Sequence, residues 1–213
     1  MKISIVALLF SFSLVACAQK KQAALVIPVG DTKPAGKEAV AYFAEGCFWH
    51  AEIVFQSLAG VRDAVSGYAG GTDQHPSYEA VSTGATGHAE TVQVYYDPSK
   101  ISYETLVAAF FASQNPTELN RQGNDEGTEY RSIAFYKTEE EKAVIEKAIA
   151  SLTAAKKYSE KIVTEVAAFK SFYPAEDYHQ EYVLHNPQNP YVQNVSLPDF
   201  MEFKKVFKGN FKP

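Results

Sequence analysis

The stretch "AVAYFAEGCFWHAEIVFQSLAG", residues 39–60, holds an apolar run, a turn and an amphipathic segment in that order. Residues 39–44 favour a buried strand, and residues 45 and 46 turn the chain. Apolar residues then recur at helical spacing and end at a glycine, namely Phe48, Ala51, Phe55, Leu58 and Gly60. The sequence therefore predicts a strand followed by a helix, with Cys47 at the helix N-terminus.

The same kind of pattern continues along the chain. Further strands are predicted at residues 61–68, 88–96 and 131–136. Helices are predicted to begin at the capping residue Ser102 and at the capping box formed by Thr138 and Glu141. The order strand, helix, strand, strand, helix, strand is that of the split βαβ motif. We therefore expect an α+β fold, a two-layer sandwich with a ferredoxin-like core.

The remaining segments complete one predicted domain, residues 39–213. The polar residues 114–130 predict a functional loop, because a loop of that length in a compact domain is usually either functional or disordered, and the predicted elements on both sides argue against disorder. Residues 161–166 predict an added strand, and residues 172–182 predict a short helix with Pro174 near its start. A chain of 213 residues with 14 Phe and 13 Tyr can fill a single core.

The first residues predict export. Lys2 precedes an apolar run at residues 3–16, which is too short for a permanent membrane span and suits a cleaved signal peptide. The run ends in "LVAC", which resembles the lipobox of bacterial lipoproteins, so Cys17 is the expected lipidation site. Residues 17–38 then form a flexible tether. We expect a protein anchored to the bacterial cell envelope on the periplasmic side; a plain signal peptide with an incidental cysteine is the alternative.

The charge and the cysteine content of the chain limit which functions are expected. The formal net charge is −5 and no basic block occurs, so nucleic-acid binding is not expected. The chain has two cysteines, which would suggest a disulfide in an exported protein unless Cys17 carries lipid. Cys47 is then a lone thiol, either an inert buried side chain or a reactive group.

A reactive Cys47 would need help to ionise. A helix N-terminus contributes about 0.3–1 kcal/mol, less than one pKa unit, so the dipole alone is not enough. His50, one turn further on, is expected either to add a positive charge or to lie solvated on the helix surface.

Glu90 leads an apolar row in the strand "HAETVQVYYD", residues 88–97. The alternation places Glu90, Val92 and Val94 on one face. A buried glutamate has a raised pKa and acts as a general acid near neutrality. Alternatively, Glu90 lies at the frayed strand end and points to water.

Several chemistries are compatible with these residues. Phe48 and Trp49 beside the thiol, with Tyr78 and Tyr130 from polar loops, predict a small apolar pocket with hydrogen-bond donors around a nucleophile. A Cys-His acyl hydrolase or transferase, with His88 or His179 as the base, is a rival. A zinc site is weaker, because Cys47 and His50 have no second cysteine pair to join them.

Four segments together resemble the peptide methionine sulfoxide reductase A family. They are "GCFWHAE" at 46–52, "GHAETVQVYYDP" at 87–98, "NRQGNDEGTEYRS" at 120–132 and "YPAEDYHQEY" at 173–182. The resemblance covers residues 39–185 and implies the same α+β fold with a ferredoxin-like centre.

The resemblance also implies an activity and roles for particular residues. Cys47 would attack the sulfur of a methionine S-sulfoxide, free or in a protein, and Glu90 would protonate its oxygen. Tyr78 and Tyr130 would hydrogen-bond that oxygen. Further contacts to substrate would come from Phe48 and Trp49, which hold the methyl group, and from Asp125, which helps to bind the substrate backbone. The products would be methionine and a sulfenic acid on Cys47.

The expected partners follow from the same resemblance. No cofactor or metal is expected, and the reductant is an external thiol such as a thioredoxin-like protein or dithiothreitol, because no cysteine follows Cys47 to resolve the sulfenic acid. We expect a monomer that repairs oxidised envelope proteins. A lipoprotein that binds methionine sulfoxide without reducing it remains the non-enzymatic alternative. Three departures from the family pattern leave substrate preference open: His50, "HPSY" at residues 75–78 and "QNPT" at residues 114–117.

Overall fold

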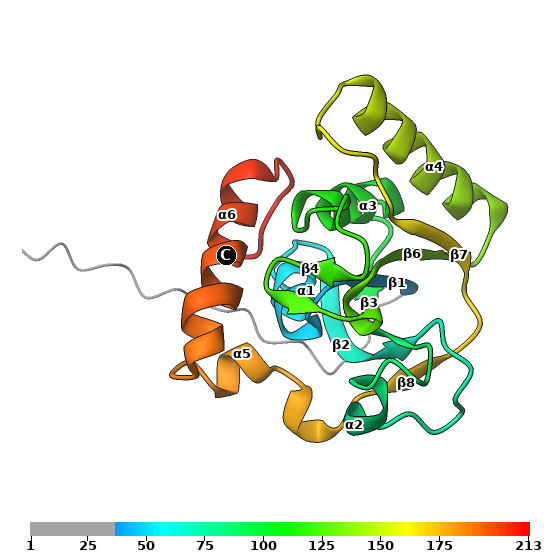
Figure 1. Cartoon of the computed structure of the whole chain (residues 1–213). Helices are drawn as coiled ribbons and strands as arrows, with labels where there is room; N and C mark the ends of the chain where they lie inside the picture. The colour runs from blue at the N-terminus through cyan, green and yellow to red at the C-terminus, as the bar shows by residue number, and fades with distance from the viewer. Residues whose placement is uncertain (1–36) are drawn as a thin grey trace, which may run out of the picture.

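The computed structural model describes residues 37–213 (Figure 1). The expected signal peptide, Cys17 and the tether up to residue 36 lie outside the described residues. Within residues 37–213 no helix is long and apolar enough to cross a membrane.

A six-stranded sheet forms the centre, in the order β7-β6-β1-β3-β2-β8. Its strands are β1 (Ala39–Glu45), β2 (Val61–Ala69), β3 (Ala89–Tyr96), β6 (Ser132–Tyr136), β7 (Glu165–Ala168) and β8 (Phe172–Pro174). The four strands β6-β1-β3-β2 are antiparallel to their neighbours, which is the ferredoxin-like arrangement. β7 adds in parallel to β6, and β8 adds in antiparallel to β2. The predicted α+β class and strand order are confirmed.

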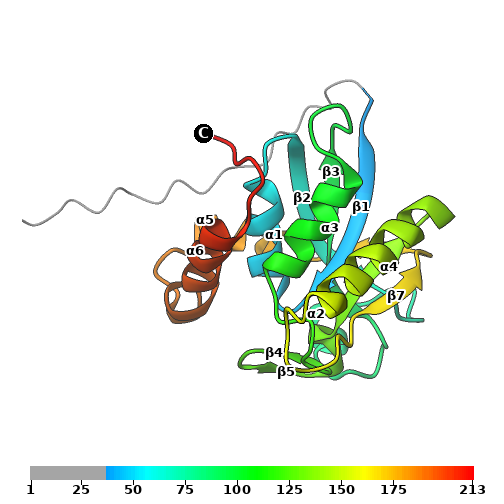
Figure 2. The ribbon, with the colours of Figure 1, turned by 90° about the horizontal axis from the view of Figure 1, so that it is seen from above.

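Helices cover one face of this sheet. α1 (Phe48–Gln56) and α3 (Tyr103–Ala112) are the two crossover helices, and α4 (Glu139–Ala154) lies beside α3 (Figure 2). The core between them and the sheet contains stacked aromatic rings: Phe43 of β1 lies 5.0 Å from Phe55 and 5.2 Å from Phe110, centroid to centroid. Such buried rings contribute large apolar areas and favour stacking.

The chain that connects β7 to β8 contributes to the opposite face of the sheet. Phe169 stacks on Tyr42 with a centroid separation of 3.7 Å, and Phe172 lies 5.7 Å from the same ring. This second, smaller cluster also contains Ile133 and Phe135. Both faces of the central strands are therefore covered.

The structure corrects several local predictions. The strand predicted at residues 161–166 is β7 at Glu165–Ala168, a few residues later. The helix predicted for residues 172–182 is wrong: this segment contains strand β8, a 3-10 turn at Asp177–His179 and the start of α5 (Tyr182–His185). The strand forms because Gly67 of β2 leaves room for it: a Cβ there would lie 2.4 Å from the Phe172 ring and from the Tyr173 carbonyl.

Two further regions carry structure that the sequence did not predict. The polar loop contains the hairpin of β4 (Arg121–Gln122) and β5 (Asp125–Glu126) and a 3-10 turn at Thr128–Tyr130. A short helix α2 (Tyr78–Val81) stands in the other polar loop. The C-terminal part ends in α6 (Leu197–Val206), which packs against α1.

The close approach of β8 to Gly67 generates a stability prediction. Replacing Gly67 with Ala should lower the free energy of unfolding by about 1–3 kcal/mol, because β8 must move away from β2. Urea unfolding monitored by circular dichroism measures the loss. An unchanged midpoint with an unchanged slope would show that β8 does not need this contact.

Candidate active site

Cys47 is held at the start of α1 by the backbone around it. The amide N–H groups of His50 and Ala51 donate to its carbonyl oxygen at 3.1 and 3.2 Å, so Cys47 is the N-cap residue. Gly46 has φ +97, and a Cβ at this position would lie 2.6 Å from the Gln122 side chain. A glycine is therefore required for the turn that presents Cys47, a residue that is partly exposed although its thiol is buried.

A cavity of about 280 Å³ opens above the thiol and gathers the predicted residues. Its lining residues are Cys47, Phe48, Trp49, Tyr78, Glu90, Asp125, Tyr130, Asn189 and Tyr191. All seven of the catalytic and substrate-contact residues predicted within the described part of the chain are in this set. Asn189 and Tyr191 were not predicted.

Glu90 is buried, and not at a frayed strand end. Its side chain is 3% exposed, and the Phe48 amide N–H donates to its Oε2 at 2.9 Å. Burial raises the pKa of Glu90 to about 8, against the opposing effect of that hydrogen bond. At neutral pH the group therefore holds a proton that it can donate into the cavity.

The thiol of Cys47 is protonated at rest. Burial, followed by the negative charge of Glu90 when ionised, raises the pKa of Cys47 well above its usual value. His50 does not supply the expected positive charge, because it is buried and burial lowers its pKa. The alternative that His50 is solvated on the helix surface is also wrong.

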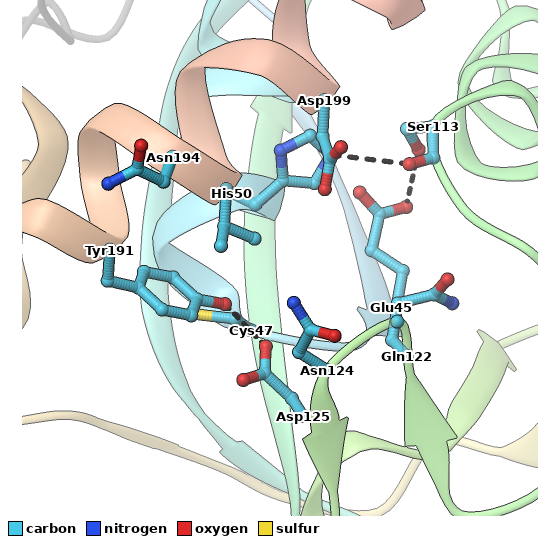
Figure 3. A pocket seen from close by; sticks show the side chains of 12 residues that line it. Glu45, Cys47, His50, Ser113, Gln122, Asn124, Asp125, Tyr191, Asn194 and Asp199 are labelled. Carbon is cyan, nitrogen blue, oxygen red and sulfur yellow. Dashed lines mark hydrogen bonds between the residues drawn. The ribbon is translucent and has the colours of Figure 1, made fainter.

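Tyr191 connects the thiol to Asp125. The Tyr191 hydroxyl donates to Oδ2 of Asp125, and the same hydroxyl lies within hydrogen-bond reach of Cys47 (Figure 3). One hydroxyl hydrogen cannot serve both acceptors at once, so it can move to the sulfur as negative charge forms there. A hydrogen bond from Tyr191 opposes the effects that raise the pKa of Cys47.

Two further tyrosines present hydroxyl groups to the cavity. Burial, then the nearby Glu90 and Cys47, raises the pKa values of both Tyr78 and Tyr130, so both remain protonated donors. Tyr78 is fixed at its backbone, where its N–H donates to Oε1 of Glu176 at 2.9 Å. The other oxygen of Glu176 accepts from the Tyr68 hydroxyl, also at 2.9 Å.

The aromatic wall of the cavity is held by the segment after β8. The Trp49 indole N–H donates to Nδ1 of His179 at 3.1 Å, and the indole stacks on Tyr182 with a centroid separation of 3.7 Å. Because Nδ1 accepts, the neutral His179 ring carries its hydrogen on Nε2. Such a fixed, flat wall suits a small apolar group such as a methyl.

The structure disfavours the alternative chemistries. His88 is occupied by backbone groups: Gly71 N–H donates to its Nδ1 at 3.1 Å, and its Nε2 contacts the Asp73 carbonyl at 2.8 Å. His179 is bound to Trp49. Neither lines the cavity at Cys47, as a Cys-His hydrolase requires. No group of metal-ligating side chains suited to an ion occurs among residues 37–213.

Tyr191 lies in "NPQNPYVQN", residues 186–194, where two prolines mark turns before a tyrosine. That pattern indicates a loop but does not say where the loop packs. The C-terminal segment folds back over α1, and this packing brings Tyr191 to the thiol.

Chemically, the site combines a thiol, a protonated carboxylic acid and hydroxyl donors around a space with an aromatic wall. This set can transfer a proton to an oxygen while sulfur attacks the atom that bears it.

Comparisons with known proteins agree with this chemistry. The family model described as "Peptide methionine sulfoxide reductase" matches residues 39–210. A peptide methionine sulfoxide reductase MsrA of Pasteurella multocida is 49% identical over 172 residues, which are 81% of this chain and 98% of that protein.

Solved structures show the same fold. The crystal structure of Mxr1 from Saccharomyces cerevisiae in reduced form matches with a TM-score of 0.69 at 34% identity, covering 76% of this chain and 93% of that one. Mxr1 in complex with Trx2 matches with a TM-score of 0.50 at 25% identity, covering 72% and 92%. With the family model spanning nearly the whole described chain, the protein belongs to the peptide methionine sulfoxide reductase family and is an oxidoreductase that reduces methionine sulfoxide.

Proposed function

We propose that this protein reduces the S epimer of methionine sulfoxide through a sulfenic acid on Cys47. The observation that carries this proposal is the buried Glu90, which lines the same cavity as Cys47 and has a pKa of about 8. Sulfoxide reduction needs a proton on the oxygen as sulfur is attacked, and a carboxylic acid that is still protonated at neutral pH supplies it.

The proposed step conserves atoms and electrons. The Cys47 sulfur forms a bond to the sulfoxide sulfur while Glu90 protonates the oxygen, assisted by hydrogen bonds from Tyr78 and Tyr130. The oxygen then passes to Cys47, which becomes a sulfenic acid, and the sulfide leaves as methionine. Phe48 and Trp49 hold the methyl group during this step.

Asp125 and Tyr191 complete the proposed site. As Cys47 loses its proton, the Tyr191 hydroxyl turns from the Asp125 carboxylate to the sulfur and stabilises the thiolate. The carboxylate, freed from this hydrogen bond, can accept a backbone N–H of the substrate. The pair thereby couples substrate binding to activation of the nucleophile.

Regeneration requires a thiol from outside the domain. Cys47 is the only cysteine among the residues that the structure describes, so none of them can resolve the sulfenic acid. We propose a thioredoxin-like reductant, which the solved complex of yeast Mxr1 with Trx2 supports by analogy. Two thiol groups reduce one sulfenic acid to a thiol and water and leave as a disulfide.

The N-terminal sequence supports a location for this repair. We propose that Cys17 is lipidated, that the protein is tethered to the cell envelope, and that its clients are oxidised envelope proteins. The apolar residues 3–16 and the "LVAC" sequence support this location.

Replacing Cys47 with Ser should abolish turnover, a loss on the order of 10³-fold or more, because the hydroxyl is a far weaker nucleophile here. The wild-type chain without added thiol should release one equivalent of methionine and gain one oxygen on Cys47. An assay of methionine release measures turnover, and mass spectrometry of the protein detects the added oxygen. Activity retained by the serine variant would exclude the mechanism, and binding of sulfoxide without methionine release would favour the non-enzymatic alternative.

Glu90→Gln should slow methionine release in a single turnover by about 100-fold or more, because the amide keeps the shape but delivers no proton. The wild-type rate should fall as the pH rises through about 8, where Glu90 loses its proton. The variant should lack this fall. A variant whose rate and pH profile match those of the wild type would show that Glu90 only fixes the Phe48 amide.

Cys17→Ser should move the protein from the membrane fraction to the soluble fraction with unchanged specific activity. Stable anchoring needs more than one acyl chain, which the lipobox would provide. Fractionation of a native host, followed by immunoblotting, measures the distribution. A variant that still sediments with membranes would rule out Cys17 as the anchor.

A further inference from the structure

A second cavity reaches Cys47 from another side. It measures about 210 Å³ and is walled by Glu45, His50, Ser113, Asn124, Asn194 and Asp199 among others (Figure 3). Its lining shares only Cys47, Asp125 and Tyr191 with the first cavity. Glu90, Tyr78 and Tyr130, the groups assigned to the sulfoxide oxygen, do not line it. Cys47 therefore borders two spaces whose linings are largely different.

Two buried polar atoms of residues that line this second cavity make no regular hydrogen bond with a described residue, although the Ser196 backbone lies close to His50. They are Oε1 of Glu45, whose side chain is 1% exposed, and Nδ1 of His50, whose side chain is 8% exposed. A buried polar atom without a partner costs about 1–3 kcal/mol, so such atoms in a cavity point to a ligand. Figure 3 shows the free oxygen of Glu45 turned away from Ser113, toward the interior of the cavity.

The neighbouring bonds fix what each atom offers. Oε2 of Glu45 lies 2.9 Å from the Ser113 hydroxyl, whose one hydrogen is also within reach of the Ala109 and Phe110 carbonyl oxygens. Burial raises the pKa of Glu45, so Oε1 presents a carboxylic acid oxygen to the cavity. His50 contacts the Ser113 carbonyl through Nε2 at 3.2 Å, so Nε2 is the donor and Nδ1 has a free lone pair. The cavity thus presents a carboxylic acid oxygen and a ring nitrogen, which are suitable partners for a group that both donates and accepts, such as a thiol.

Displacement at sulfur has a directional requirement. A thiol that attacks a sulfenic acid approaches the sulfur along the line of the S–O bond, from the side opposite the oxygen. If Glu90 and the two tyrosines hold that oxygen, its S–O bond points into the first cavity. Of the two spaces that border Cys47, the second cavity is then the one left for a thiol that approaches the sulfur from behind.

We propose that the second cavity is the site from which the reducing thiol attacks oxidised Cys47; this inference rests on the sulfenic acid proposed above. The thiol sulfur bonds to the Cys47 sulfur, its proton goes to Nδ1 of His50, and the S–O bond breaks. The oxygen leaves as water with the proton of Glu90. A second thiol then attacks the mixed disulfide, releases the reductant as a disulfide and returns Cys47 to the thiol.

Acidic residues at the second cavity affect which thiols can enter it. Asp199 lies exposed at the rim, and Asp125 is shared with the first cavity. No Lys or Arg is among the lining residues. Like charges repel, so neutral thiols should enter more readily than anionic ones.

Blocking the cavity from its rim tests the proposal. Asn194 is exposed on the segment before α6, and its Nδ2 donates to the Pro190 carbonyl at 2.7 Å. Asn194→Trp should place a ring over the opening. Its neighbour Gln193→Trp is the matched control, because Gln193 is also exposed and also donates to a backbone carbonyl, but does not line the cavity.

The two half-reactions are measured separately. Methionine released in a single turnover without thiol reports the first half and also shows that the variant is folded. Re-reduction of the isolated sulfenic form by 2-mercaptoethanol reports the second. We expect Asn194→Trp to slow re-reduction at least 10-fold with unchanged methionine release, and Gln193→Trp to change neither. Equal re-reduction rates in all three proteins would overturn the proposal, whereas absence of methionine release in the wild type would overturn the sulfenic acid mechanism instead.

Two further arms identify the thiol. Asp199→Asn should speed re-reduction by the anionic 3-mercaptopropionate by about threefold relative to 2-mercaptoethanol, because screened repulsion at a surface is modest. The ratio of the two rates is the readout, since the Asp199 charge also raises the pKa of His50 and affects both thiols alike. No gain for the anion would contradict the cavity as the route. With thioredoxin as the reductant, slowing by Asn194→Trp would show that a protein cysteine uses the same cavity, and wild-type rates would restrict it to small thiols.

Discussion

The hydrogen bond from the Phe48 amide to Glu90 joins the first turn of α1 to the central strand β3, and the geometry of the site depends on it. The N–H must point at an oxygen lone pair of Oε2, which leaves Oε1 to carry the acid hydrogen. Cys47 immediately precedes that amide, so one contact of 2.9 Å fixes Cys47 relative to the Glu90 carboxyl group. Because it is buried, the contact is not weakened by competing water.

The edge strand β8 leads into the segment that holds the aromatic side of the site. Beyond it, Glu176 holds the Tyr68 hydroxyl and the Tyr78 backbone, and His179 holds the Trp49 indole. The ferredoxin-like centre thus supplies Cys47 and Glu90, and the segment beyond the added edge strand supplies the aromatic wall of the cavity. A small residue at Gly67 is what allows the two parts to meet.

Local patterns in the sequence predicted the regular core. The helical spacing of residues 48–58 and the alternation of residues 88–97 predicted a helix and a strand, and both elements form as α1 and β3. The one-sided burial that helical spacing implies is absent from α1, where every residue except Trp49 is buried. Local patterns could not predict contacts between segments that are distant in the sequence. Burial of His50 depends on α6, the position of Tyr191 depends on the return of the C-terminal chain, and β8 pairs with β2 because of space at Gly67. Spacing alone could not decide whether Glu90 was buried, since the first residues of a strand are buried only if a neighbour covers them.

The raised pKa of Cys47 affects how fast its thiol reacts with oxidants. Peroxide and hypohalous acid, which damage methionine, oxidise thiolates much faster than thiols. A free cysteine with an ordinary pKa of about 8.5 would keep a few per cent of thiolate at pH 7, and Cys47 keeps less. In the proposed mechanism the thiol would react slowly with freely diffusing oxidants and would ionise when a sulfoxide is bound, so the resting ionisation state would contribute to chemical selectivity.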